Sequence, residues 1–506
     1  MAVALGAGNK PSERSGPFGV TPDFFWHSLW DTRLSSTVNN SSRIALFSAF
    51  FIGVALFYAP LAYGCTRPEM LPGLYALLIA AMVIGTFSFV KDQRWPVVPR
   101  TVRVCSAALL AQGWFLTWNP TFPSLVAANQ WTVDVGMDKV WSLSFHSMVA
   151  TTLLLGSFAL LCDLLGHANT RRFILLSAAV SGTLVSVVGV VLKIVGEPLM
   201  QYVWRPPDID WNDFAFYRYH GNAGAFLNLA WPLILVFTRR AYTPTFGYAR
   251  KIVWTLASAA CASALFLNAS KAALVIGLLI LPWPFLTRLL RMKRKAFIIL
   301  AAVFLLLVVG GVVLSSLLAK EAAFQRLTNA SEVSASFDGR IAAYQQYVNT
   351  VPEVGAFGIG PGLFQAAFPY QFSVTRNVGA AVRDYAHEDY LQTVLEWGWL
   401  GTIWWTVLVA GGLYRAIWTY QQRDRFPSKT ERHLVLAGIL GVCGTLAQAL
   451  LDFPLQVVSV RLFFLVLLAL CWVSPRLLSA SPEEAKRIHY RLPIPAYLFK
   501  TSSREP

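Results

Sequence analysis

The sequence predicts an all-α polytopic membrane protein. Of its 506 residues, 56% are hydrophobic and only 13% are charged, whereas soluble domains are about 45–50% apolar and about 25% charged. The apolar residues gather in runs long enough to cross a bilayer, which takes about 20 residues of helix. The six cysteines show neither a disulfide framework nor a CxxC metal site.

Twelve apolar runs are candidate transmembrane helices. They cover approximately residues 44–64, 71–90, 104–118, 143–163, 173–194, 223–238, 252–269, 272–288, 296–318, 394–416, 434–452 and 459–478. The chain then divides into an N-terminal segment, nine helices, a large loop, three further helices and a tail, with bounds 1–43, 44–318, 319–393, 394–478 and 479–506.

Lys and Arg residues explain both the net charge of +16 and the orientation. They collect in alternate connections between the apolar runs, and basic loops stay on the cytoplasmic side of a membrane. Both termini are therefore predicted to be cytoplasmic, and nothing in residues 1–43 has the pattern of a removable signal. Topology and contact with anionic membrane lipids account for the charge, so no nucleic-acid partner is needed.

The outward loop over residues 319–393 is too long to be a structureless connection in a compact protein. Residues Asp338–Val351 predict a short helix that ends before Pro352. The stretch GAFGIGPGLF, from Gly355 to Phe364, predicts a turn in which glycines adopt positive φ at low cost. We therefore expect this loop to be a folded, functional element.

Three cations occur on separate outward segments. Arg218, followed closely by His220, precedes the sixth run, Lys271 lies in the short hairpin after the seventh, and Arg340 begins the predicted loop helix. A cation at a helix start opposes the helix dipole, which favours an anionic partner for Arg340. Together these residues would suit a pyrophosphate and would stabilise its departure without a metal. The alternatives are that Arg218 anchors its helix at the interface and that Lys271 snorkels.

The stretch YAHEDYLQTVLEWGWLG, residues 385–401, carries ionisable groups directly into an apolar run. A helix that begins near Glu388 would place one polar stripe at i, i+3, i+4 and i+7: Asp389, Gln392, Thr393 and Glu396. The stripe should face protein, and Glu388 and Asp389 suit a first helical turn. Gly398 and Gly401 should permit close helix contact. His387 is left without a structural role and is the candidate catalytic residue.

These motifs together resemble a known family. They are AHEDYLQTVLEWGWLG, with a His before a Glu-x-Gly-x-x-Gly ending; DGRIAAYQQY followed by VPEVGAFGIGPGLF; the SKAA hairpin; and RYHGNAGAFLNLAWP before the sixth run. The sequence resembles the O-antigen ligase and polymerase superfamily of bacterial membrane glycosyltransferases over roughly residues 205–475. This resemblance implies a GT-C-like helical protein of the inner membrane, with residues 319–393 and the active site facing the periplasm.

The resemblance also implies the reaction. A glycan would pass from undecaprenyl pyrophosphate to an acceptor sugar hydroxyl, such as that of lipid A core, with inversion and without a metal or other cofactor. His387 matches the family's loop histidine, and Arg340 matches its loop arginine, implied to contact the pyrophosphate. Lys271 stands where many members have arginine, so it keeps the charge but not the bidentate geometry. His220, Asp389 and Glu396 would be supporting residues.

Two other functions stay open on the sequence alone. A polymerase would use a second lipid-linked repeat as acceptor, and LDFPLQVVSV resembles members that assemble exopolysaccharide. A flippase or secondary transporter would use Asp452, Pro454 and Arg461 as part of a gate, and these residues equally suit a structural ion pair. A transporter should place its polar groups near the bilayer midplane, whereas here they cluster at outward ends. Transfer chemistry is therefore favoured over transport.

Overall fold

The computed structural model describes residues 40–128, 136–195, 214–268, 270–281, 341, 344–345, 347–371 and 385–478. Within these ranges the regular elements are helices, which confirms the predicted all-α class. The α-helices are α2 (Asn40–Leu61), α3 (Leu71–Lys91), α4 (Arg100–Trp118), α5 (Phe122–Ala128), α6 (Met137–Leu164), α7 (Ala168–Val195), α9 (His220–Ala241), α10 (Tyr248–Leu267), α11 (Lys271–Ile280), α16 (Phe364–Gln371), α17 (Asp389–Gln421), α18 (Lys429–Ala449) and α19 (Val458–Val473).

Nine of the described helices are long and apolar enough to cross a membrane: α2, α3, α6, α7, α9, α10, α17, α18 and α19. They correspond to nine of the twelve predicted spans. The third predicted span forms helix α4, which carries Arg100 and Arg103 in its first turn and is less apolar. The eighth is described only as the short apolar helix α11. The ninth, residues 296–318, lies outside the described residues.

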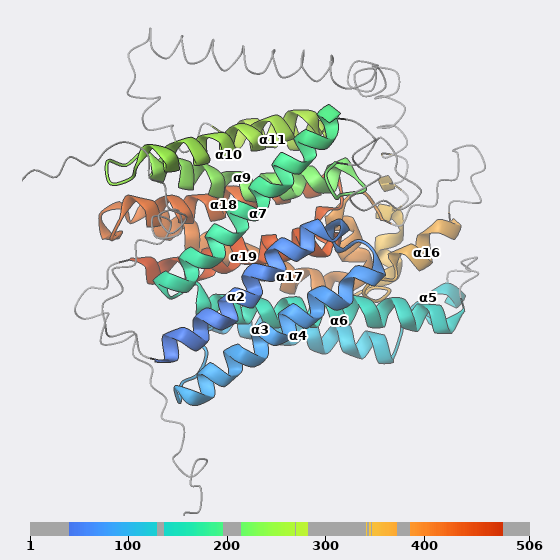
Figure 1. Cartoon of the computed structure of the whole chain (residues 1–506). Helices are drawn as coiled ribbons and strands as arrows, with labels where there is room; N and C mark the ends of the chain where they lie inside the picture. Colours follow the sequence, from blue (N-terminus) through green and yellow to red (C-terminus); the bar gives the residue numbers. More distant parts are fainter. Residues whose placement is uncertain are drawn as a thin grey trace, which may run out of the picture. The chain divides into compact units, whose positions relative to one another are not determined.

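Helices α9 and α19 form the centre of the bundle. Helix α9 packs against α7, α10, α11, α18 and α19, and its residues are buried along nearly the whole length. Helix α19 also packs against α6, α17 and α18, and α4 packs against both α6 and α17 (Figure 1). An all-round buried helix can be apolar on every face, which explains the run VRLFFLVLLALCWV in α19.

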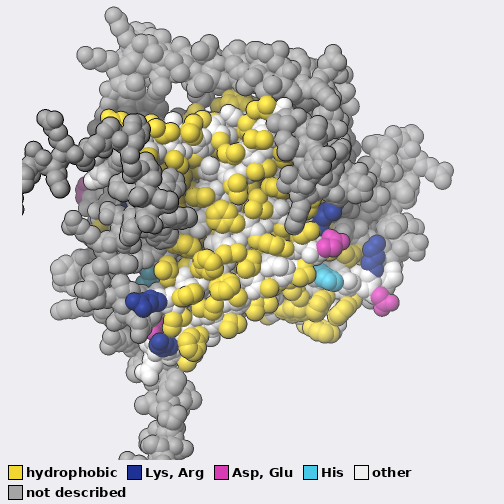
Figure 2. All heavy atoms as spheres, in the orientation of Figure 1, with side chains coloured by type: hydrophobic (Ala, Val, Ile, Leu, Met, Phe, Trp, Pro, Cys, Tyr) yellow, Lys and Arg dark blue, Asp and Glu magenta, His cyan; other side chains and the backbone are white. Residues whose placement is uncertain are grey.

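The outer faces of the peripheral helices suit contact with lipid. Figure 2 shows hydrophobic side chains across the middle of the visible face, with charged side chains towards its two sides. Exposed apolar residues recur along single helices, for example Ile79, Val83 and Phe87 on α3. This belt, between two zones that carry the charges, is the surface expected of a multi-pass membrane protein.

Two ion pairs with buried carboxylates fasten one end of the bundle. Arg94 Nη1 lies 2.7 Å from Asp163 Oδ1, and Arg171 Nη2 lies 3.0 Å from Glu431 Oε1. Arg171 lies in the basic connection between the predicted spans 143–163 and 173–194, but its side chain is buried and holds α7 against α18. Part of the basic charge therefore has a packing role in addition to setting the topology.

The loop helix comprises the described helical residues 341, 344–345 and 347–354. The prediction that it ends before Pro352 is wrong, because the helix continues through Val354. Gly355, with φ of +62°, supplies the left-handed conformation that commonly follows a helix C-terminus. The predicted glycine turn, Gly355–Phe364, is confirmed: Gly358, Gly360 and Gly362 also have positive φ.

Candidate active site

His387 lies where the chain leaves the loop and begins α17. Its φ is +56°, which is uncommon for a residue with a side chain and costs about 1–2 kcal/mol. The Tyr344 hydroxyl, from the loop helix, donates a 2.6 Å hydrogen bond to the His387 carbonyl oxygen. Such strain persists only where surrounding contacts hold it, and it concentrates at functional sites.

The His387 imidazole faces a buried carboxylate. Its Nδ1 lies 3.6 Å from Asp452 Oδ1, and within the described residues neither ring nitrogen makes a hydrogen bond. Asp452 is only 5% exposed and accepts the Phe453 N–H at 3.1 Å. A Cβ placed on Gly221 would lie 2.0 Å from Asp452 Oδ2, so a larger residue there would displace this carboxylate from its present position. His387 and Asp452 thus form a candidate catalytic pair.

Three stacked aromatic rings hold the imidazole from the side. Phe453 is parallel to Tyr219 at 5.4 Å between ring centroids and to Tyr385 at 4.4 Å. The His387 ring meets Phe453 edge to face at 4.8 Å and meets Tyr219 in the same way at 6.1 Å. The stack joins the segment before α9, the segment before α17 and the hairpin between α18 and α19. It restricts imidazole rotation, because edge-to-face geometry is favourable for aromatic pairs.

Asp389 is a structural residue of this site. Its carboxylate accepts the Leu455 N–H at 2.8 Å and the Gln456 side-chain amide at 2.9 Å. These bonds fix the α18–α19 hairpin, which carries Asp452, against the start of α17. Asp389 was predicted as a supporting residue, and in the structure it bonds to the hairpin that carries Asp452.

Glu396 holds the glycine turn. Its carboxylate accepts the backbone N–H of Gly362 at 3.0 Å and of Phe364 at 3.4 Å, and the Gln392 amide at 3.1 Å. Asp389, Gln392 and Glu396 are buried and Thr393 is half-buried, so the predicted polar stripe does face protein. Buried polar groups must be hydrogen-bonded to avoid a large desolvation cost, and here the loop supplies several of the partners.

Glu388 begins helix α17 as its N-cap. Its carboxylate accepts the backbone N–H groups of Tyr390 and Leu391, which confirms the predicted helix start. Burial raises the pKa of the Glu388 carboxyl, and the two N–H donors oppose that change. The cap fixes the position of the chain just before α17, where His387 lies.

Gly398 interrupts α17 with a kink, at φ +61° and ψ −173°. We predicted close helix contact at this glycine, but its partner is the glycine turn. A Cβ on Gly398 would lie 2.3 Å from the Ala356 oxygen, and one on Gly358 would lie 2.4 Å from the Gly398 nitrogen. At the kink, backbone groups of α17 form hydrogen bonds with the glycine turn instead of within the helix. Ile359 N–H donates to Leu395 O at 2.9 Å, and Gly360 N–H donates to Glu396 O at 3.0 Å. Leu400 N–H donates to Ala356 O at 3.0 Å. The loop and α17 are therefore interlocked through backbone.

Two of the three predicted cations, Arg218 and Lys271, lie at the same end of the bundle. Arg218 and Lys271 are exposed, and in the described part of the chain they form no hydrogen bond or ion pair. His220 begins α9; its carbonyl accepts the Asn268 amide at 2.8 Å, and its ring lies 4.7 Å from Tyr219. The Asn268 bond brings the hairpin that carries Lys271 to the segment that carries Arg218. Arg340 lies outside the described residues.

Asp452 and Tyr344 are the site residues that sequence reasoning missed. The sequence indicated Asp452 only as part of a transporter gate with Pro454 and Arg461, or as part of a structural ion pair. A lone acid between two apolar runs was the available signal, because an acid at that depth needs a partner. Tyr344 gave no signal, since its hydrogen bond goes to backbone. No group of three or more His, Cys, Asp or Glu side chains with metal-binding proximity is found among the residues described.

A comparison with family models identifies the central part of the chain. Residues 256–406 match the O-antigen ligase family, in agreement with the resemblance derived from the motifs. The matched segment contains Lys271, the loop helix, the glycine turn and His387. Arg218 and Asp452 fall outside it. A comparison with curated proteins gives no match.

Proposed function

We propose that this chain, whose residues 256–406 match the O-antigen ligase family, is a membrane glycosyltransferase of the ligase type. It transfers a glycan from undecaprenyl pyrophosphate to a sugar hydroxyl of lipid A core at the periplasmic face of the bacterial inner membrane. The observation that carries this proposal is His387, inside the matched segment, placed 3.6 Å from the buried Asp452 and constrained by a strained backbone.

The geometry supports general-base catalysis. With the proton on Nδ1, facing Asp452, Nε2 has its lone pair available for the acceptor hydroxyl. The hydroxyl oxygen attacks the anomeric carbon from the face opposite the leaving group, and its proton passes to Nε2. The bond between the anomeric carbon and the pyrophosphate oxygen breaks, and its electron pair leaves with undecaprenyl pyrophosphate. Asp452 then stabilises the imidazolium, as the carboxylate of a Ser-His-Asp triad does.

Asp452→Asn is expected to lower the rate of transfer about 10- to 100-fold. We expect less than the ~10⁴-fold loss at a triad carboxylate, because the 3.6 Å separation from His387 Nδ1 is too long for a hydrogen bond. The measurement is the initial rate of product formation by purified protein. Asp424→Asn, at an exposed acid of the α17–α18 connection, is the control. A full rate for Asp452→Asn would remove Asp452 from the mechanism.

The exposed cations suit the donor pyrophosphate. Hydrogen bonds to charged groups contribute about 1.5–3 kcal/mol, so Arg218→Gln and Lys271→Gln are each expected to raise the donor KM about tenfold or more. The KM for the acceptor should be unaffected. The control is Arg423→Gln, which removes the same charge from an exposed arginine after α17. If all three variants have the same donor KM, Arg218 and Lys271 do not bind the donor.

The defining experiment supplies purified protein in vesicles with undecaprenyl pyrophosphate-linked glycan and one acceptor at a time, and identifies products by mass. Glycan joined to lipid A core supports the ligase. A lengthened lipid-linked glycan would instead show a polymerase, which uses a second repeat as acceptor. If the glycan crosses the vesicle membrane and no covalent product forms, the protein is a flippase and the proposal is overturned.

A further inference from the structure

We propose that a cavity along the loop helix binds a neutral sugar residue, and that Tyr344 links this cavity to His387. The inference rests on the proposed function, because the sugar belongs to one of the two glycans that meet at His387. It adds a binding subsite, its ligand chemistry and a positioning residue.

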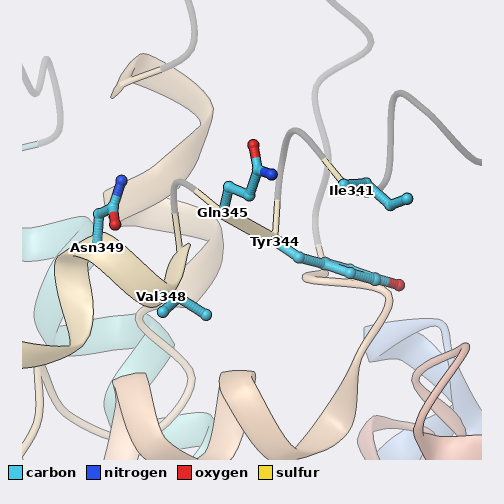
Figure 3. Close-up of a pocket in the computed structure, with 5 residues that line it drawn as sticks. All are labelled: Ile341, Tyr344, Gln345, Val348 and Asn349. Carbon is cyan, nitrogen blue, oxygen red and sulfur yellow. The ribbon is translucent and has the colours of Figure 1, made fainter.

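The cavity follows one face of the loop helix. Its volume is about 430 Å³, and it is lined by Ile341, Tyr344, Gln345, Val348 and Asn349. These positions are spaced by three or four residues, so they form a single stripe on a helix. Figure 3 shows the amides of Gln345 and Asn349 directed to the same side. The volume lies within the roughly 300–1,000 Å³ of small-molecule sites.

The lining has the chemistry that a neutral sugar requires. Gln345 and Asn349 each offer an amide donor and a carbonyl acceptor, which match hydroxyls that both donate and accept. Tyr344, Ile341 and Val348 present apolar surface to the C–H faces of a sugar ring. The five lining side chains include no charged group, so nothing among them would balance a pyrophosphate. The cavity is thus suited to the sugar part of a substrate.

Tyr344 connects the cavity to the catalytic histidine. Its ring lines the cavity, and its hydroxyl donates to the His387 carbonyl oxygen at 2.6 Å. That hydrogen bond helps to hold His387 in its left-handed backbone conformation. A sugar packed on the Tyr344 ring would restrict the side chain and so fix the imidazole. Tyr344 is therefore a positioning residue, and occupancy of the cavity favours the reactive geometry.

The loop helix is anchored on its other face, so the wall of the cavity that this helix provides is preformed. Tyr347 is fully buried and meets Phe364 edge to face, with 5.3 Å between ring centroids. Val354, Ile359 and Leu363 belong to the same small apolar core beneath the loop. A preformed site avoids the entropic cost of ordering side chains upon binding.

Binding is tested without catalysis in the His387→Ala protein. Saturation-transfer NMR measures binding of two probes: the glycan released from undecaprenyl pyrophosphate, and the deacylated core oligosaccharide. We expect a signal from at least one probe, which identifies the source of the sugar. The double change Gln345→Ala and Asn349→Ala should raise its Kd about tenfold. Glu353→Gln, at an exposed residue of the same helix outside the cavity, is the control.

Two results would overturn the subsite: no signal from either probe, or equal affinity for the double variant and the Glu353→Gln control. Thermal melting of the double variant confirms that a lower affinity is not caused by unfolding. These outcomes are independent of the proposed function, which fails instead if the parent protein makes no covalent product.

Kinetics with Tyr344→Phe test the link to His387. This change keeps the ring that lines the cavity and removes only the hydroxyl. We expect kcat to fall about tenfold, a loss that corresponds to one hydrogen bond, while the KM for each glycan stays within twofold of the parent value. A raised KM with an unaltered kcat would show that Tyr344 contributes only to binding, and an unchanged kcat would disprove the link.

Discussion

His387→Ala is expected to reduce glycan transfer by about 10²- to 10⁴-fold, the usual contribution of a positioned general base. The loss should appear in kcat, because the imidazole acts on the reacting hydroxyl and the donor is held by other groups. Initial rates of product formation, followed by mass spectrometry with purified protein, provide the measurement.

Two companion variants isolate the chemistry of His387 from its strained backbone. Asn tolerates left-handed φ better than other residues with side chains, so His387→Asn removes the base and retains the conformation at φ +56°. It should be as inactive as His387→Ala. His146→Ala, at an exposed histidine of α6, should keep the parent rate. A near-parent rate for His387→Asn would mean that the imidazole does not take the proton.

Local sequence patterns predicted the start of α17 and the glycine turn that packs against it. The N-cap at Glu388, the buried stripe through Gln392 and Glu396, and the glycine turn each depend on neighbours within a few residues. Such features are fixed by helix periodicity, by the unsatisfied N–H groups of a first turn and by the φ range of glycine. The membrane spans were likewise readable, because a bilayer requires long apolar runs.

The proximity of His387 and Asp452 could not be predicted because it depends on tertiary packing. Asp452 reaches His387 only after Asp389 has fixed the α18–α19 hairpin and Gly221 has allowed α9 to approach. No periodicity relates these positions, which lie on separate helices and hairpins. The part played by Gly398 was misread for a related reason. A glycine in an apolar helix is compatible both with close helix contact and with a kink, and only the position of the glycine turn decides between them.

Gly398→Ala should strongly destabilise the protein although it leaves every functional side chain in place. The backbone at φ +61° and ψ −173° is in a region that is essentially restricted to glycine. Another residue in this conformation lowers the stability of the protein by about 1–3 kcal/mol. The added Cβ would also lie 2.3 Å from the Ala356 oxygen, a backbone atom that cannot rotate away. The glycine turn must shift, and the hydrogen bonds from Gly362 and Phe364 to Glu396 should break with it.

Gly355→Ala is the matched control for this change. Gly355 also has positive φ, at +62°, but a Cβ there would meet no atom within 4 Å. Gly355→Ala should therefore lower the free energy of unfolding only through the strained backbone conformation, by about 1–2 kcal/mol. It should keep most of the transfer activity. We expect Gly398→Ala to show a clearly lower apparent Tm in detergent than Gly355→Ala and to lose transfer activity, because the turn and α17 together hold the site. If the two variants melt at the same temperature, the contact between the turn and the kink does not stabilise the protein. The strain at Gly398 would then have to be explained by the local geometry of α17 alone.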